Sequence, residues 1–420
     1  MTEIQLAYGT TSVGLKVSDS RFEVLSAHKP DRQPLTDYQL GEQFDRPIAS
    51  APLDELFSAN DSVLLVVSDA TRATGSAQIV NLLVRRLIEV GVSPGNVAII
   101  FATGIHRAVT AVEKSELLTP FVAQRIKTLD HNAYDASQMI TLGTTKRGTP
   151  VELNRALKDY SHIVITGGIG FHYFAGFTGG RKSICPGLAS ARTIEATHML
   201  ALDFETGQRR NGVHIAGLKG NAVHEECDEI AAMIGPTLGI NTVVDQQGRT
   251  VRLYSGNWRE AHVTACAEYL EDHSIAIEAR RDVVIVSCGG SPYDINLIQA
   301  HKALDMAAHA CVDGGEIILL AECADGLGRP DFLKWFDVND STELSMRLRS
   351  KYEVNGQTAW SLLTKAERCR VQLLSALPDE DVRHMRMSPA RSLDEAFANL
   401  KGTGAGYILP RGAALLPQVL

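Results

Sequence analysis

Several features that would assign a class of protein at once are missing from this sequence. Its seven cysteines are odd in number and form no Cys-x-x-Cys pair, which argues against a disulfide framework or a zinc ribbon. No run of about 18 apolar residues is present that could span a bilayer. Residues 1–20 have no basic flank followed by an apolar core. We therefore expect no secretory signal, no membrane partner and a cytoplasmic protein with reduced thiols.

An excess of positive charge is also missing. The 420 residues include 41 Lys and Arg against 49 Asp and Glu, a net charge of −8, and no basic stripe is visible. We therefore expect no nucleic-acid partner. Local pairs such as Arg181-Lys182 remain compatible with a small anionic ligand. A composition that is 45% hydrophobic and 21% charged is typical of a globular protein with roughly two or three domains.

One glycine-rich stretch, Thr166–Cys185, is the most informative part of the sequence. It follows a short apolar run, 162–165, that predicts a buried strand. Six glycines let the backbone turn tightly and approach a ligand closely, and His172, Arg181 and Lys182 lie among them. The simpler alternative is a tight glycine turn that carries a solvated Arg-Lys pair.

Neither common phosphate-binding motif fits this stretch. In a P-loop, the lysine directly follows the last glycine, but Arg181 stands between Gly180 and Lys182. Gly168 and Gly170 resemble the start of a dinucleotide fingerprint, but Tyr173 occupies the position of its third glycine. Motif matching alone therefore assigns no ligand.

The surrounding pattern predicts an α/β fold. Residues 63–67 form a continuous apolar run, as in a central parallel strand, and residues 78–90 show helical periodicity. Another strand is expected over 96–102, and a capping box at Thr110–Glu113 opens the next helix. Alternating strands and helices of this kind build a largely parallel sheet.

Polar side chains follow three of these predicted strands. Asp69 and Arg72 come after the first, His106 after the second, and the loop with His172 and Lys182 after the third. Ligands of parallel α/β sheets bind outside the carboxyl ends of the strands, so we expect these residues to share one site. Taken singly, the aspartate is more often a helix cap and a histidine more often a hydrogen-bonded structural residue.

His198 lies in a helix predicted over 190–201. Among Ala196, Met199 and Leu200 it is either a core histidine or a metal ligand. No second histidine or cysteine is placed nearby in the sequence to complete a site built from protein alone. If His198 binds a metal, the other ligands must come from something that is not protein.

A second α/β unit is expected after a charged hinge at 278–282. A buried strand over 282–287 leads into a helix over 295–309, which places Gln299 and Lys302 on one face. These two suit a carboxylate, although a surface lysine on an ordinary helix is the simpler reading. We predict two α/β domains, 1–275 and 276–420, with largely parallel sheets and an active-site cleft between them.

Five separated motifs resemble the lactate racemase family. The longest is Phe171–Ala189; the others are Asp69-Ala-Thr-Arg72, Gly104-Ile-His106-Arg107, Ala-Thr-His198 and Gln299-Ala-His-Lys302. They occur in the family's order, and the resemblance extends from about residue 40 to residue 410.

The resemblance implies a cofactor and a set of roles. The family uses nickel held by pyridinium-3,5-bisthiocarboxylic acid mononucleotide, which together form the nickel-pincer nucleotide. Cofactor-synthesis enzymes make this nucleotide, and we expect them as transient partners. By position, Lys182 would join it covalently and His198 would bind nickel. The remaining assignments are acid/base catalysis for His106 and His172, substrate binding for Arg72, Gln299 and Lys302, and cofactor contacts for Asp69, Gly179 and Gly180.

The implied reaction interconverts the D and L forms of a small 2-hydroxy acid. One histidine takes the hydroxyl proton while hydride moves to the cofactor, a 2-keto acid forms, and hydride returns to its other face. Two residues differ from the family's usual pattern: Ala73 replaces a proline and Ile298 a tyrosine. Because of the second change, malate is a possible substrate as well as lactate. His301 and Arg107 are the candidate residues that would bind its second carboxylate. Alternatives are an epimerase of a larger hydroxy or sugar acid, a nicotinamide-dependent dehydrogenase, and a protein that only stores the cofactor.

Overall fold

A computed structural model describes residues 2–17, 21–26 and 32–420 of the chain. The chain divides into two compact units. Unit 1 comprises the described residues of Met1–Pro30, together with Leu202–Arg209 and Glu271–Leu420. Unit 2 comprises the described residues of Asp31–Ala201 together with Arg210–Leu270.

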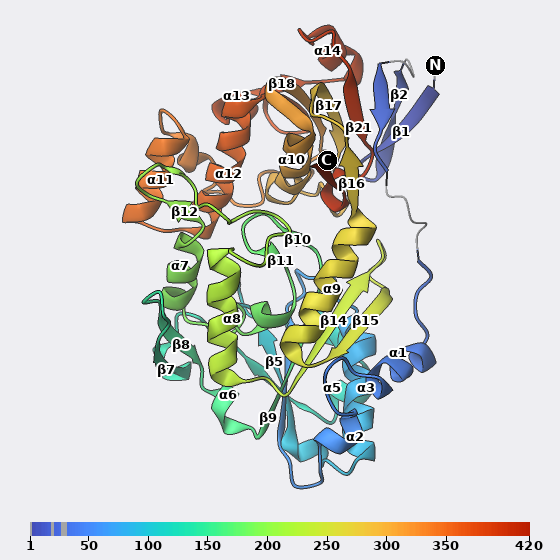
Figure 1. The fold of residues 1–420 in the computed structure, drawn as a ribbon, viewed down its shortest axis with the longest axis vertical. Helices are drawn as coiled ribbons and strands as arrows, with labels where there is room; N and C mark the ends of the chain where they lie inside the picture. Colours follow the sequence, from blue (N-terminus) through green and yellow to red (C-terminus); the bar gives the residue numbers. More distant parts are fainter. Residues whose placement is uncertain (1, 18–20, 27–31) are drawn as a thin grey trace. The chain divides into compact units, whose positions relative to one another are not determined.

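Unit 2 is built on a six-stranded sheet (Figure 1). Five neighbouring strands run parallel, and the edge strand β15 is antiparallel to its neighbour β14. The parallel part confirms the prediction made from the alternating strand and helix pattern. The strand order is β15 (Thr250–Gly256), β14 (Leu238–Val244), β9 (His162–Gly168), β4 (Val63–Ser68), β5 (Val97–Ala102) and β6 (Lys127–Asp130).

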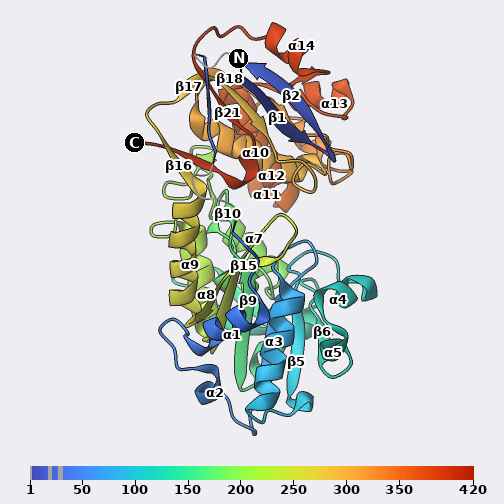
Figure 2. The same ribbon diagram turned by 90° about the vertical axis from the view of Figure 1, so that its right-hand side faces the viewer.

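Helices cover both faces of this sheet, which explains the continuous apolar run in β4. Leu64 and Val66 pack in a core with α7 (Ala191–Met199) and α8 (Ala222–Ile234). Val63, Leu65 and Val67 point to the opposite core with α3 (Ser76–Glu89) and α1 (Asp37–Asp45). Because successive side chains alternate between faces, a strand buried on both sides must be apolar throughout. Figure 1 shows α8 and α3 on opposite sides of the sheet, and in Figure 2 α3 lies in front of it.

The glycine-rich stretch folds back on itself directly after β9. It contains a short antiparallel hairpin of β10 (Phe171–His172) and β11 (Gly176–Phe177), followed by a 3-10 turn over Gly180–Ser183. The helix α9 (Trp258–His273) contributes residues that pack against this stretch. The predicted strand-then-loop organisation is therefore present, with a hairpin that the sequence pattern did not indicate.

Unit 1 has a six-stranded sheet that is parallel throughout. Helices α10 (Leu297–Ala310) and α12 (Val354–Arg368) pack on one face. A hairpin of β1 (Thr2–Tyr8) and β2 (Thr11–Val17) packs on the other with α14 (Leu393–Ala398). The strand order is β20 (Ser388–Ala390), β19 (Arg370–Leu374), β18 (Cys311–Leu320), β17 (Arg281–Ser287), β21 (Gly406–Leu409) and β3 (Phe22–Val24).

The compact units are not the two contiguous segments predicted from the sequence. The amino-terminal strand β3 pairs with β21, and Leu6 and Leu15 of the first hairpin are buried in the core of unit 1. The chain also enters unit 1 through the hairpin of β12 (Leu202–Asp203) and β13 (Gln208–Arg209). The predicted hinge at 278–282 lies inside unit 1, where it follows β16 (Ser274–Ile277) and includes the first two residues of β17. Over the described residues, no helix has the length and apolar character needed to cross a membrane.

Candidate functional site

Three adjacent strands of unit 2 deliver the predicted site residues. β9, β4 and β5 are direct neighbours and parallel, so their carboxyl ends lie at one edge of the sheet. Asp69 directly follows β4, His106 follows β5 by four residues, and His172 follows β9 by four residues. The expectation that these strand ends converge is met by the strand order.

Asp69 and His106 form a hydrogen-bonded pair. His106 Nδ1 lies 2.8 Å from Asp69 Oδ2, and Thr71 donates its backbone N–H and its hydroxyl to Asp69 Oδ1 at 2.9 and 2.5 Å. Burial opposes ionisation, but the bonds from His106 and Thr71 hold the pKa of Asp69 below its ordinary value. An ionised carboxylate only accepts, so Nδ1 of His106 carries a proton. A neutral ring in this tautomer has its lone pair on Nε2, which is the atom that a general base uses.

Arg107, the neighbour of His106 in sequence, is paired with a carboxylate. Arg107 donates both terminal nitrogens to Glu113, at 2.8 Å and 2.5 Å, and its side chain is exposed. Arg107 therefore presents no uncompensated charge for a second substrate carboxylate. A small cavity of about 30 Å³ is lined by Asp69, Thr71, His106, Arg107 and Glu113 among others, and it offers room for about one water.

His172 has a different partner. Its Nδ1 lies 3.2 Å from the backbone nitrogen of Ala175, in the turn of the β10–β11 hairpin. A backbone N–H can only donate, so Nδ1 of His172 is the acceptor and the proton of the neutral ring is on Nε2. His172 thus carries the opposite tautomer to His106.

Three predicted site residues surround one aromatic ring. The ring of Phe174 lies 4.5 Å from that of His172 and 5.1 Å from that of His198, between centroids. Lys182 Nζ lies 5.7 Å from the same centroid. Phe174 itself is buried, so the three polar side chains are grouped around an apolar surface.

Both predicted cofactor ligands are electrostatically suited to bind as neutral groups. Burial lowers the pKa of Lys182 to about 7. The positive charges of Arg181 and Arg72 act in the same direction, and nearby cysteines act against it. Burial, then the charge of Lys182, lowers the pKa of His198 to about 3. A neutral amine is a nucleophile and a neutral imidazole is a metal ligand.

Gly179 and Gly180 are required by contacts within the protein. Both have positive φ, 78° and 52°. A Cβ on Gly179 would lie 2.9 Å from Asn241 Oδ1, and one on Gly180 would lie 2.6 Å from the ring of His262. Their predicted contact with a cofactor stays a prediction, because packing against Asn241 and His262 already explains both glycines.

Arg181, Asn241 and His262 are supporting residues that the sequence analysis missed. Arg181 is 1% exposed and donates to His262 Nε2 at 2.8 Å, and Asn241 Oδ1 accepts from the backbone of Gly180 at 2.8 Å. Arg181 was read only as half of a basic pair. His262 gave one available signal, because with Cys266 it lies on the buried face of α9.

In unit 1, Gln299 and Lys302 are joined as the helical spacing predicted. Lys302 Nζ donates to Gln299 Oε1 at 2.7 Å, near the start of α10, whose first turn is capped by Asn296. The amide nitrogen of Gln299 and the ammonium of Lys302 are both donor groups, which suits a carboxylate. His301 donates Nδ1–H to the carbonyl of Ile298 at 2.7 Å, and burial lowers its pKa to about 4. A neutral His301 does not supply the charge expected of a reader of a second carboxylate.

The described residues contain no group of three or more His, Cys, Asp or Glu side chains arranged to hold a metal ion.

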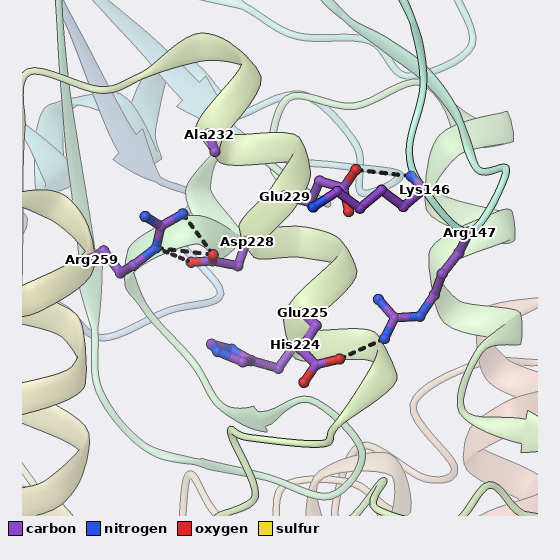
Figure 3. Close-up of a pocket in the computed structure, with 8 residues that line it drawn as sticks. All are labelled: Lys146, Arg147, His224, Glu225, Asp228, Glu229, Ala232 and Arg259. Atoms are coloured by element: carbon purple, nitrogen blue, oxygen red, sulfur yellow. Dashed lines mark hydrogen bonds and ion pairs between the residues drawn. The ribbon is translucent and has the colours of Figure 1, made fainter.

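A separate cavity of about 470 Å³ in unit 2 includes none of the predicted site residues (Figure 3). Arg259 pairs with Asp228, and Arg147 with Glu225, across its walls. The other lining residues are Lys146, His224, Glu229 and Ala232.

The geometry defines a class of protein: an α/β protein with a hydrogen-bonded histidine–aspartate pair at the carboxyl edge of a parallel sheet. Residues 8–209 match the family model described as the lactate racemase N-terminal domain, and residues 277–406 match the lactate racemase C-terminal domain. The chain belongs to the lactate racemase family, which places it among the racemases and so among the isomerases.

Individual relatives agree with this family. The chain is 28% identical to lactate racemase from Thermoanaerobacterium thermosaccharolyticum and 29% identical to lactate racemase from Lactiplantibacillus plantarum, each over 94% of both chains. The lactate racemase apoprotein structure from T. thermosaccharolyticum has a TM-score of 0.90 at 26% identity, over 99% of this chain and 100% of that one. A protein from Thermotoga maritima shares the fold, with a TM-score of 0.67 at 18% identity over 92% and 99% of the chains.

Proposed function

We propose that this chain racemises a small 2-hydroxy acid of the lactate type with the help of a nickel-pincer nucleotide. The observation that supports this most strongly is the grouping of His172, Lys182 and His198 around Phe174. Family membership supports the reaction class, and the lactate racemase relatives support lactate as the first substrate to test.

The residues present fit the proposed cofactor. A pKa of about 7 leaves a large part of Lys182 as a free amine near neutral pH, as a covalent attachment point requires. His198 is neutral, and the described residues offer no complete metal site, so a nucleotide that brings its own donor atoms would complete the coordination. When bound, the nickel nucleotide would accept hydride from the α-carbon of the substrate and return it.

His106 would exchange the hydroxyl proton of one enantiomer. Its Nε2 lone pair takes the proton, and Asp69 stabilises the resulting imidazolium through the bond to Nδ1. His172, with a proton on Nε2, donates a hydrogen bond to the substrate oxygen. To give the product oxygen its proton, His172 must first take a proton from water on Nδ1, which breaks the bond from Ala175. It then releases the Nε2 proton and has a lone pair there for the proton of the other enantiomer.

Lys302 and Gln299 would hold the substrate carboxylate with charge-assisted hydrogen bonds. Arg72 lies close enough to lower the pKa of Lys182 and to act on Asp69, so we propose that it adds positive charge beside the reacting groups. Because Arg107 is matched by Glu113 and His301 is neutral, a substrate with one carboxylate fits better than malate.

The test is to co-express the chain with enzymes that make the nucleotide and to measure intact mass and nickel content. We expect a nucleotide-sized adduct that maps to Lys182 and about one nickel per chain, as a single metal ligand from the protein would give. Lys182→Arg should lose the adduct, and His198→Ala should keep it but lose nickel.

The loaded protein is then given single enantiomers of lactate and of malate, and the products are separated by chiral chromatography. Conversion of either lactate enantiomer to the racemate supports the proposal. Unchanged chirality in a protein with full adduct and nickel would contradict it, and net oxidation that depends on added nicotinamide would identify a dehydrogenase instead.

A further inference from the structure

Arg181 is a buried cation without a carboxylate partner among the described residues. Its side chain is 1% exposed, yet its bonds go to neutral groups: His262 Nε2 at 2.8 Å, the Ala175 carbonyl at 2.8 Å and the Gly179 carbonyl at 3.4 Å. Burying a charge is unfavourable unless several hydrogen bonds replace its water. A guanidinium that is buried without a carboxylate partner indicates that its planar set of hydrogen-bond donors has a specific role.

On one side, Arg181 is held by His262 from helix α9. A guanidinium can only donate, so Nε2 of His262 accepts and the ring is the neutral Nδ1–H tautomer. The Thr178 carbonyl lies 3.0 Å from the same nitrogen, but a carbonyl also only accepts. The shorter, charge-assisted bond from Arg181 therefore determines the tautomer. His262 is 2% exposed, and the ring of His224 stacks on it at 6.3 Å.

On the other side, Arg181 holds the turn that faces His172. Its Nη2 donates to the carbonyl of Ala175, which also accepts from the backbone of Phe177 at 2.9 Å. The N–H of the same Ala175 donates to Nδ1 of His172. Because Ala175 is bound on both sides and is 1% exposed, its N–H has one direction available.

We infer that Arg181 and His262 are positioning residues that set the tautomer of His172. Through Ala175 they keep Nδ1 of His172 as an acceptor and its ring proton on Nε2, where the substrate oxygen would bind. The catalytic meaning rests on the proposed function, in which His172 acts on substrate. The tautomer itself is a property of the protein alone.

The test is side-chain nuclear magnetic resonance on protein with ¹⁵N-labelled histidine, purified without nickel or nucleotide. His172→Asn identifies the His172 signals by their loss. We expect the wild type to show protonated Nε2 and unprotonated Nδ1 with widely separated nitrogen shifts. In Arg181→Met and in His262→Leu the separation should shrink, because both tautomers become populated.

Two further variants make the test specific. The amide oxygen of His262→Gln can still accept from Arg181, so this variant should keep the wild-type His172 spectrum. His224→Leu removes the stacked ring but none of the bonds to Arg181, so it should also leave the spectrum unchanged. A His172 spectrum identical to the wild type in folded Arg181→Met and His262→Leu would overturn the inference.

If those two variants do not fold, His262→Gln is compared with His262→Asn, whose shorter amide does not reach Arg181. A difference at His172 between them supports the inference, and identical spectra overturn it. The two ideas can fail separately. If the variants alter the tautomer of His172 but the cofactor-loaded wild type does not racemise lactate, the proposed function is wrong and the positioning role stands.

Discussion

The surroundings of His106 and His172 differ in the atom that each histidine offers. A buried carboxylate binds Nδ1 of His106 at 2.8 Å, whereas a backbone N–H binds Nδ1 of His172 at 3.2 Å. In the neutral rings, the first partner leaves a lone pair on Nε2 and the second leaves a proton on Nε2. Two side chains of one type are therefore held in opposite tautomers by their partners alone.

The largest effect is expected when each histidine loses Nε2 but keeps its supporting bond. In His106→Asn the amide N–H can still donate to Asp69, and in His172→Asn the amide oxygen can still accept from Ala175. We expect both variants to fold like the wild type and to lose about 10²–10⁴-fold in kcat/KM. Initial rates from each lactate enantiomer measure this. Near-normal racemisation in either variant would remove that histidine from the mechanism.

A third histidine, His131, shows what a purely structural role looks like. It is 1% exposed, with Nε2 bound to the Ala189 carbonyl and Nδ1 to Asn154, both at 3.1 Å. Burial lowers its pKa from 6.5 to about 4, against the smaller effect of the Ala189 bond. The unfolded chain thus binds the proton more readily, and stability is lost as pH falls from 6.5 towards 4.

This loss amounts to about 3 kcal/mol at most. Denaturant unfolding across that pH range should give a steeper fall for the wild type than for His131→Gln, which cannot titrate. Activity per folded molecule near neutral pH should be the same in both. An equal pH dependence of unfolding would show that other groups dominate acid destabilisation.

Asp69→Asn alters the surroundings of His106 and leaves those of His172 intact. The neutral amide keeps the size of the side chain but removes one charge-assisted bond, which is worth about 1.5–3 kcal/mol. We expect kcat/KM to fall roughly 10–100-fold, with the His172 tautomer unchanged. The control is Asp54→Asn, which changes an exposed carboxylate elsewhere. An equal loss of kcat/KM in this control would contradict a specific role for Asp69.

Arg107→Gln should have the smallest effect. Arg107 adjoins His106 in sequence, but its guanidinium is exposed and paired with Glu113. Exposed pairs of this kind contribute about 0–1 kcal/mol, so stability and kcat/KM for lactate should change little. A large loss of activity would show that Arg107 acts on substrate, and would reopen the question of a second carboxylate.

Local pattern was enough to predict what lies along one strand or helix. The runs that form β4, β5, β9 and β17 were identifiable because strands buried on both faces are apolar throughout. The parallel order also predicted that the strand ends before Asp69, His106 and His172 lie at one edge of the sheet, as the strand order shows. Pairing between distant segments was not predictable in the same way: β3 joins β21 across most of the chain, and no local feature announces it.

Hydrogen-bond partners in the site were likewise beyond the sequence pattern. Asp69 was expected to contact cofactor, and its observed bonds are to His106 and Thr71. Arg181 and His262 meet because α9 packs beside the glycine-rich stretch, a contact between residues 81 positions apart. The motifs singled out candidate residues, whereas the tautomers and charges of those residues depend on neighbours in space that no motif names.

The most direct test of the account follows the α-hydrogen. Lactate of one enantiomer, deuterated at carbon 2, is incubated in ordinary water with the cofactor-loaded protein, and the opposite enantiomer is isolated. If His106 and His172 exchange only the hydroxyl proton, the product keeps its deuterium. If the deuterium is lost to water, a side chain removes the α-hydrogen as a proton, and the roles proposed for both histidines are wrong.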